Sequence, residues 1–206
     1  MRNVIFTIFA PNDSLIIYCE IDMFVMNGLQ VLECKQTLED MVSQANLTDE
    51  NRKNVYNSSI VIVPVEYYGT VLLFPSGTSD FYQYCIEKYG IGIEICSNDE
   101  DYKEIEQCSF QLRLGKIHVK EIALGIIGSL IASYTYDALK FNFNLPKPEI
   151  KTEYQAEPTV SFSIIVSDST GTVQKEFKYE GLAKDVKEVT DNIEALWHEE
   201  YNKSRD

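Results

Sequence analysis

The longest apolar stretch of the chain runs over residues 118–141, HVKEIALGIIGSLIASYTYDALKF. No charged residue occurs from Ile122 to Tyr136, and the Leu, Ile and Ala residues here favour a helix. At about 1.5 Å per residue this uncharged segment spans roughly 22 Å, less than the roughly 30 Å hydrocarbon core of a bilayer. The pattern therefore predicts a long buried apolar helix over 118–141, with a membrane-associating helix as the alternative.

Small residues recur at i+3 and i+4 spacing along one side of this predicted helix, and such positions lie on one face. The stripe consists of Gly125, Gly128, Ser129, Ala132 and Tyr136. In a soluble protein it predicts close packing of a sheet or a second helix, whereas in a membrane it would be a dimerisation face. Because the apolar run is short and interrupted by Ser and Thr, the soluble interpretation is favoured.

The N-terminal third of the chain has the pattern of a β-meander. Residues 3–9 and 15–25 are apolar enough for strands, and Asn27-Gly28 lies between two apolar runs, 24–26 and 29–32. Asn-Gly is the strongest short hairpin signal, since both turn positions need a positive φ. A short helix is expected next, with Leu38, Met41, Val42 and Ala45 on one face, followed by a polar connector over 46–58.

Strand and helix patterns alternate from residue 59 to the apolar helix. The expected elements are strands at 59–67 and 70–74, a helix at 79–89, a strand at 91–96, a helix from Ser97 or Asn98 to 107, and a strand at 110–114. Pro64 makes the first of these an edge strand or a strand end, and Gly90 fits as a helix stop. This alternation predicts an α/β fold with a mixed sheet, although an α+β arrangement fits the same pattern.

Prolines and polar residues over 142–158 indicate a linker that follows a main α/β domain at 1–141. Residues 159–206 then form a clear ββα pattern. Its two alternating strands are joined by a turn at Asp168–Gly171, and an amphipathic helix follows. A hairpin with one helix is near the lower size limit of independent stability, so this C-terminal unit is expected to dock on the main body or on a partner.

The composition restricts the classes of function. Lys and Arg total 18 against 32 Asp and Glu, a formal net charge of -14. An acidic chain repels phosphate backbones and anionic lipids, so nucleic-acid binding is excluded and membrane binding is disfavoured. Five unpatterned cysteines, together with an N-terminus that lacks a small-residue cleavage site, predict a reduced, cytoplasmic protein.

The loop that joins the strand at 70–74 to the helix at 79–89 is the first candidate ligand site. Free backbone N–H groups at a helix start can hold a phosphate or a carboxylate, and the residues in position are Ser76, Gly77, Thr78 and Ser79. The loop lacks the Lys of a P-loop and the glycine spacing of a dinucleotide fingerprint. An ordinary helix cap needs the same residues, and that interpretation is favoured.

Three charged strand residues form the second candidate ligand site. By alternation, Glu94 and Arg113 point away from the apolar faces of their strands, and Glu66 lies near the end of another. If the strands are neighbours, these side chains could converge, but a solvated ion pair explains them equally well and is favoured. Only His118 and His198 could serve as a general base, and neither lies in a nucleophile motif. No metal-ligand spacing occurs, so no cofactor or metal is predicted.

These patterns predict a non-catalytic, soluble accessory or assembly subunit that binds another protein subunit or a second copy of itself. The predicted partner-binding residues are Trp197, Ile193 and Val189 on the C-terminal helix. The first alternative is an enzyme that binds a small molecule or a nucleotide at the 75–80 loop. The second is a membrane-associating protein that inserts its 118–141 helix.

Overall fold

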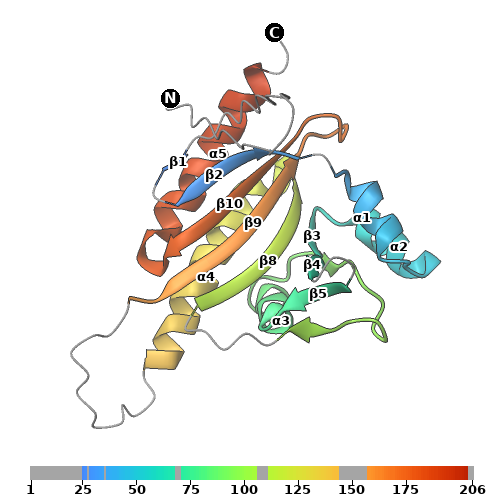
Figure 1. Cartoon of the computed structure of the whole chain (residues 1–206), viewed down its shortest axis with the longest axis horizontal. Helices are drawn as coiled ribbons and strands as arrows, with labels where there is room; N and C mark the ends of the chain where they lie inside the picture. Colours follow the sequence, from blue (N-terminus) through green and yellow to red (C-terminus); the bar gives the residue numbers. More distant parts are fainter. Residues whose placement is uncertain are drawn as a thin grey trace, which may run out of the picture.

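A computed structural model describes residues 25–26, 28–34, 36–67, 71–105, 111–143 and 157–203 (Figure 1). Within these residues, seven strands form a mixed sheet in the order β1-β2-β10-β9-β8-β3-β6, and three short strands form a second sheet in the order β4-β5-β7. The predicted α/β class is confirmed. The strand expected at 3–9, residues 15–24 of the strand expected at 15–25, and most of the expected 142–158 linker lie outside the described residues.

The main sheet is built around a parallel pair of long strands, β8 and β9. β3 and β6 are also parallel, and the other neighbours in this sheet are antiparallel. The strands of the sheet are β1 (Val25–Met26), β2 (Leu29–Glu33), β3 (Ile60–Val63), β6 (Ile93–Ile95), β8 (Gln111–Lys120), β9 (Thr159–Ser167) and β10 (Gln174–Leu182). The predicted hairpin at Gly28 is confirmed, because β1 pairs with β2 and Gly28 has a φ of 87°.

The second sheet consists of β4 (Val65–Tyr67), β5 (Val71–Pro75) and β7 (Glu104–Ile105). Pro64 lies between β3 and β4, and it ends the ladder of the main sheet because it has no N–H to donate. The expected single strand at 59–67 is therefore divided between two sheets. β3 is not an edge strand, since it lies between β8 and β6.

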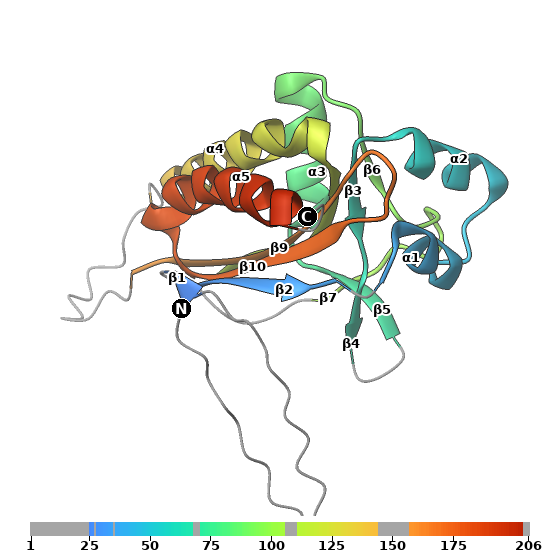
Figure 2. The ribbon, with the colours of Figure 1, turned by 90° about the horizontal axis from the view of Figure 1, so that it is seen from above.

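Helices cover both faces of the main sheet. They are α1 (Leu38–Gln44), α2 (Asp49–Asn57), α3 (Thr78–Tyr89), α4 (Leu124–Phe143) and α5 (Val186–Lys203), with short 3-10 turns at Glu121–Ala123 and Ala183–Asp185. α4 and α5 lie side by side on one face, while α1 and α2 lie at the end of the sheet that contains β3 (Figure 2). β9, β10 and α5 continue the main body, so the C-terminal ββα segment docks on it by sharing its sheet.

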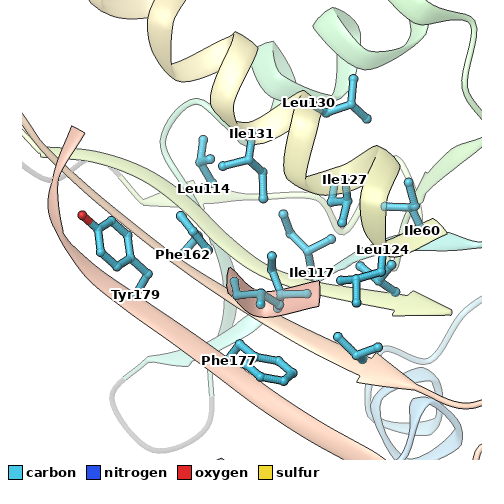
Figure 3. Close-up of a cluster of buried hydrophobic side chains, with 14 of the residues drawn as sticks. Ile60, Leu114, Ile117, Leu124, Ile127, Leu130, Ile131, Phe162, Phe177 and Tyr179 are labelled. Atoms are coloured by element: carbon cyan, nitrogen blue, oxygen red, sulfur yellow. The ribbon is translucent and has the colours of Figure 1, made fainter. Parts of the chain in front are cut away.

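The principal core lies between the sheet and the helices α3, α4 and α5 (Figure 3). α4 contributes Leu124, Ile127, Leu130 and Ile131, all of them at most 4% exposed. Alternate residues of β8, β9 and β10 meet them, because successive side chains of a strand point to opposite faces. This set includes Ile117, Phe162, Ile164, Phe177 and Tyr179.

A smaller core lies on the opposite face of the sheet, under α1 and α2. It contains Val61, Val63 and Ile165 from the strands, with Met41, Val42, Leu47, Val55 and Cys96. Asn98 ties this layer together, since its side chain accepts from the backbone N–H of Thr48 and donates to the backbone carbonyl of Asn46. The helix expected from Ser97 or Asn98 to 107 is therefore wrong: a turn follows Asn98, and Glu104–Ile105 is a strand.

The predicted apolar helix differs from α4 in two respects. Residues 118–120 belong to β8, where Ile117 and Val119 alternate as core-facing strand positions, and the α-helix begins at Leu124. The helix is also not buried all round, since Ile122 is 83% exposed, Ile126 46% and Tyr136 67%. The 3.6-residue period of apolar positions predicted a helix, but it does not indicate how many sides of that helix the rest of the protein covers.

The glycine side of α4 lies against α5. A Cβ at Gly128 would be 3.2 Å from the Cβ of Thr190, whereas a Cβ at Gly125 would meet only the Glu194 carboxylate, at 3.5 Å. The expectation that the small residues admit a second helix is confirmed at Gly128.

We expect Gly128→Val to lower the free energy of unfolding by about 1–3 kcal/mol, because the new side chain overpacks the crossing of α4 and α5. Urea unfolding at low protein concentration measures this. Gly125→Val is the matched control on the same helix, and it should change stability by less than about 0.5 kcal/mol because Glu194 can move aside. Equal losses for both variants would contradict the close packing at Gly128.

Candidate functional site

The first candidate ligand site, the N-terminus of α3, is occupied by a side chain of the same protein. The Glu104 carboxylate accepts hydrogen bonds from the backbone N–H groups of Gly77 (3.2 Å) and Ser79 (2.9 Å). It also accepts from the hydroxyl of Tyr102. A carboxylate at this end of a helix is favoured by the helix dipole as well as by the hydrogen bonds.

The remaining residues of this loop have structural roles. Thr78 is fully buried, and its hydroxyl donates to the carbonyl of Pro75 at 2.8 Å. Gly77 precedes the first turn with a φ of 93°, a conformation that favours glycine. The residues predicted to hold a phosphate, Ser76 to Ser79, thus form a helix start that Glu104 already satisfies, as the alternative interpretation expected.

The second candidate ligand site is not brought together. Glu94 lies on β6 and Arg113 on β8, and β3 runs between these two strands. Glu66 lies on β4, in the second sheet. The condition that Glu94 and Arg113 lie on neighbouring strands is therefore not met. Burial raises the pKa of the Glu94 carboxyl above its ordinary value, but no basic side chain forms an ion pair with it among the described residues.

The predicted partner-binding residues are core residues of the protein itself. Trp197 is 1% exposed, Ile193 1% and Val189 3%. These side chains form the inner face of α5 against the sheet, and Trp197 stacks on Tyr201 with ring centroids 5.6 Å apart. Sequence periodicity placed them correctly on one apolar face, but that face is used within the chain and offers a partner no exposed surface.

His118 lies inside the smaller core face of the sheet and is 3% exposed. Its neighbours across the sheet are Val61 and Ile165. Burial, with a smaller effect of the Lys120 charge, lowers the pKa of the imidazole to about 4. No hydroxyl or thiol hydrogen-bonds to it among the described residues, so a buried neutral histidine describes it better than a general base.

An unusual surface of the described residues is the outer face of α4 taken together with the 3-10 turn that precedes it, called here the outer face of α4. It comprises Ile122 of the turn and Ile126, Ser129, Ser133 and Tyr136 of the helix. They recur at i+3 and i+4 spacing, so they lie on the side of the helix away from the core. The large apolar members of this set, Ile122, Ile126 and Tyr136, are exposed, and no charge interrupts the set. Contiguous exposed apolar side chains of this kind mark interaction sites.

The same helix satisfies the length and composition of a membrane span. An 18-residue window within Glu121–Lys140 has a mean hydropathy of 1.4, and 33% of this window is buried in the protein. A core helix passes the same test, so the finding by itself does not separate a protein partner from a lipid surface.

Charged residues stand at both ends of the outer face of α4. Asp137 is neutralised within the protein, because Lys88 of α3 lies 2.5 Å from its carboxylate and the Tyr84 hydroxyl donates to it at 2.9 Å. These contacts lower the pKa of Asp137 below its ordinary value. Glu121 and Lys140 have no ion-pair partner among the described residues, and they are the remaining charges of residues 121–140.

A groove of about 810 Å³ opens beside this face, where α4 and α5 diverge from their close contact at Gly128. Its apolar lining includes Ala132, Leu139, Pro158, Leu182 and Val186. The rim carries two ion pairs, Lys184 with Glu157 and Lys187 with Asp191. The remaining polar residues of its lining are Ser129, Ser133, Tyr136, Lys140 and Thr190, and no Cys or His is among the residues that line it.

No group of three or more His, Cys, Asp or Glu side chains that could hold a metal ion occurs in the part of the chain that the structure describes. Comparison with known proteins gives no match to a family model, to a curated protein or to a solved structure.

We expect Glu104→Gln to destabilise the protein by about 1 kcal/mol, because the neutral amide loses the favourable interaction with the α3 dipole and can no longer accept both N–H groups. Urea unfolding at neutral pH checks this. Glu100→Gln, in the exposed turn nearby, removes the same charge and is the control. Equal effects of the two substitutions would contradict the capping role of Glu104.

A second prediction concerns the pH dependence of stability. The pKa of His118 in the folded protein is about 4, below the value of about 6.5 in an unfolded chain. As the pH falls, His118 therefore takes up a proton in the unfolded chain before it does so in the folded protein. The stabilisation that the neutral His118 contributes is complete above about pH 6.5 and is lost progressively toward pH 4.

Between pH 7.5 and 5, this single group should remove about 2 kcal/mol of unfolding free energy. His118→Leu should abolish that share, so the difference between wild type and variant should change with pH, as measured by urea unfolding across this range. His198→Leu, at an exposed position of α5, controls for the loss of a histidine. A wild-type-minus-variant difference that is constant with pH would contradict the buried neutral state.

Proposed function

We propose that this chain is a non-catalytic accessory or assembly subunit that binds another protein through the outer face of α4. The observation that carries the proposal is the exposure of Ile122, Ile126 and Tyr136 on a helix face without charge. Large parts of these side chains face water, since Ile122 is 83% exposed, Tyr136 67% and Ile126 46%. Covering them removes apolar surface from water at about 25 cal/mol per Å².

A protein partner fits this face better than a lipid bilayer. The Glu194 carboxylate of α5 lies against Gly125, so hydrocarbon that reached α4 would also have to receive this charge. Lys187 and Asp191 pair on the same helix at the side of the groove. The net charge of -14 also opposes approach to an anionic membrane surface.

The proposal is tested by placing a photo-crosslinking amino acid at position 136 of the full chain in cells that express it. We expect discrete protein adducts, and Ile126→Asp in the same chain should lower their yield at least about tenfold, because a buried carboxylate disrupts an apolar contact. The same crosslinker at Tyr56, an exposed aromatic position of α2, is the control.

Adducts of equal yield at positions 136 and 56, or adducts with lipid alone at position 136, would refute the proposal. The second outcome would place α4 on a membrane instead.

A further inference from the structure

We propose that the partner of the outer face of α4 is a second copy of this chain, bound by an antiparallel contact of the two α4 helices across a two-fold axis. This inference rests on the proposed function and names its partner. A contact of this symmetry requires a patch that is complementary to itself, and α4 meets this requirement both in its side chains and in its charges.

The side chains of the outer face match in an antiparallel pair. When the two-fold axis passes at Ser129, a residue that lies a given number of positions before Ser129 in one copy lies opposite the residue that is the same number of positions after Ser129 in the second copy. Ile122, seven positions before the axis, therefore lies opposite Tyr136, seven positions after it. Ile126 lies opposite Ala132 and Ser133 of the second copy. Both exposed isoleucines thus contact an aromatic or small side chain in the other copy, and Tyr136 covers Ile122.

Small residues at the centre allow the two helices to approach. Ser129 is exposed on α4, and its short side chain would not hold a second helix away. Gly125 lies one turn earlier, on the side that the Glu194 carboxylate of α5 reaches. Helix axes come within about 8 Å only where the side chains at the crossing are small. The largest exposed side chains, Ile122 and Tyr136, lie toward the two ends of the contact. There Ile122 of one copy lies opposite Tyr136 of the second copy.

The charges at the ends match only in this orientation. Glu121 lies eight positions before the axis and Lys140 eleven positions after it, an offset of roughly 4.5 Å along the helix. A lysine side chain can span that offset. The antiparallel pair therefore makes the same Glu121–Lys140 ion pair twice, whereas a parallel pair would place like charges together. Asp137 does not interfere, because Lys88 already neutralises it.

The size of the contact sets the expected affinity. The uncharged face is roughly 21 Å long, and one helix face buries less than the roughly 800 Å² per partner of a standard interface. We therefore expect a dimer that dissociates in the micromolar range. The experiment should cover concentrations from about 1 to 200 µM.

The experiment is sedimentation equilibrium of the purified full chain without detergent, from which the dimer dissociation constant is obtained. Glu121→Lys and Lys140→Glu should each raise the constant about tenfold, because each substitution replaces two attractive pairs by two repulsive ones. The double variant, and an equimolar mixture of the two single variants, should return to within about threefold of wild type, since both restore opposite charges across the axis. Ile126→Asp should leave a monomer at every concentration.

Val71→Asp is the control, because Val71 is 47% exposed on β5, in the second sheet. It should leave the dimer unchanged, and circular dichroism should show that all variants are folded.

A wild-type monomer at about 200 µM would overturn the inference. If position 136 still crosslinks to protein in cells, the proposed function stands with a different partner. Single variants that weaken the dimer without mutual rescue would overturn the antiparallel arrangement.

Discussion

The parallel pairing of β8 with β9 is the constraint on which most of this structure depends. Nine register positions join the two strands, and a hairpin cannot connect parallel neighbours, so the chain must cross from one end of the sheet to the other. α4 makes that crossing and must therefore lie against the sheet. β10 and β2 then extend the sheet from β9 by antiparallel pairing, and α5 completes the helical layer beside α4.

The crossing of α4 over the sheet explains why the inner face of this helix is apolar, but it does not explain why the outer face is apolar. Leu124, Ile127 and Ile131 are almost fully buried, and each such side chain contributes about 1.5–3 kcal/mol through burial. That face is enough to hold the helix on the sheet, so the fold would tolerate Lys or Glu at positions 122, 126 and 136. Much of the apolar surface of the residues found there is exposed among the described residues. Contact with a partner would cover this surface, and the exposure therefore supports the proposed function.

Sequence periodicity was sufficient for elements whose side chains alternate or repeat cleanly. The ββα segment, the Gly28 hairpin and the α3 helix with its Gly90 stop were all predictable, because local patterns and turn residues agreed. The start of α4 was not, since His118 and Val119 join an apolar run that fits a strand or a helix equally well. The 97–107 segment failed for a different reason: a polar stretch such as Asn98–Asp101 serves as a helix cap in one context and as a turn in another.

The candidate site was less predictable than the fold, because exposure and partner choice are tertiary properties. The α3 start had the residues of an anion site, but the occupying carboxylate, Glu104, came from a strand 25 residues further along the chain. Trp197 was predicted to bind a partner, but it lies on the inner face of α5 and packs in the core of the protein. The lack of charge along 122–136 was visible in the sequence, but only the position of the sheet and of α5 separates the covered side from the open one.

The candidate ligand sites and His118 differ from the outer face of α4 in how far their groups are satisfied within the fold. The helix start at Gly77 has two of its N–H groups bound by Glu104, burial lowers the pKa of His118 to about 4, and Glu94 and Arg113 are on strands that are not neighbours. The start of α3 is satisfied within the fold, whereas Arg113 Nε and His118 Nε2 are buried without a hydrogen-bond partner among the described residues. On the outer face of α4, in contrast, Ile126 and Tyr136 remain exposed among the described residues. This exposure supports the proposed role in association.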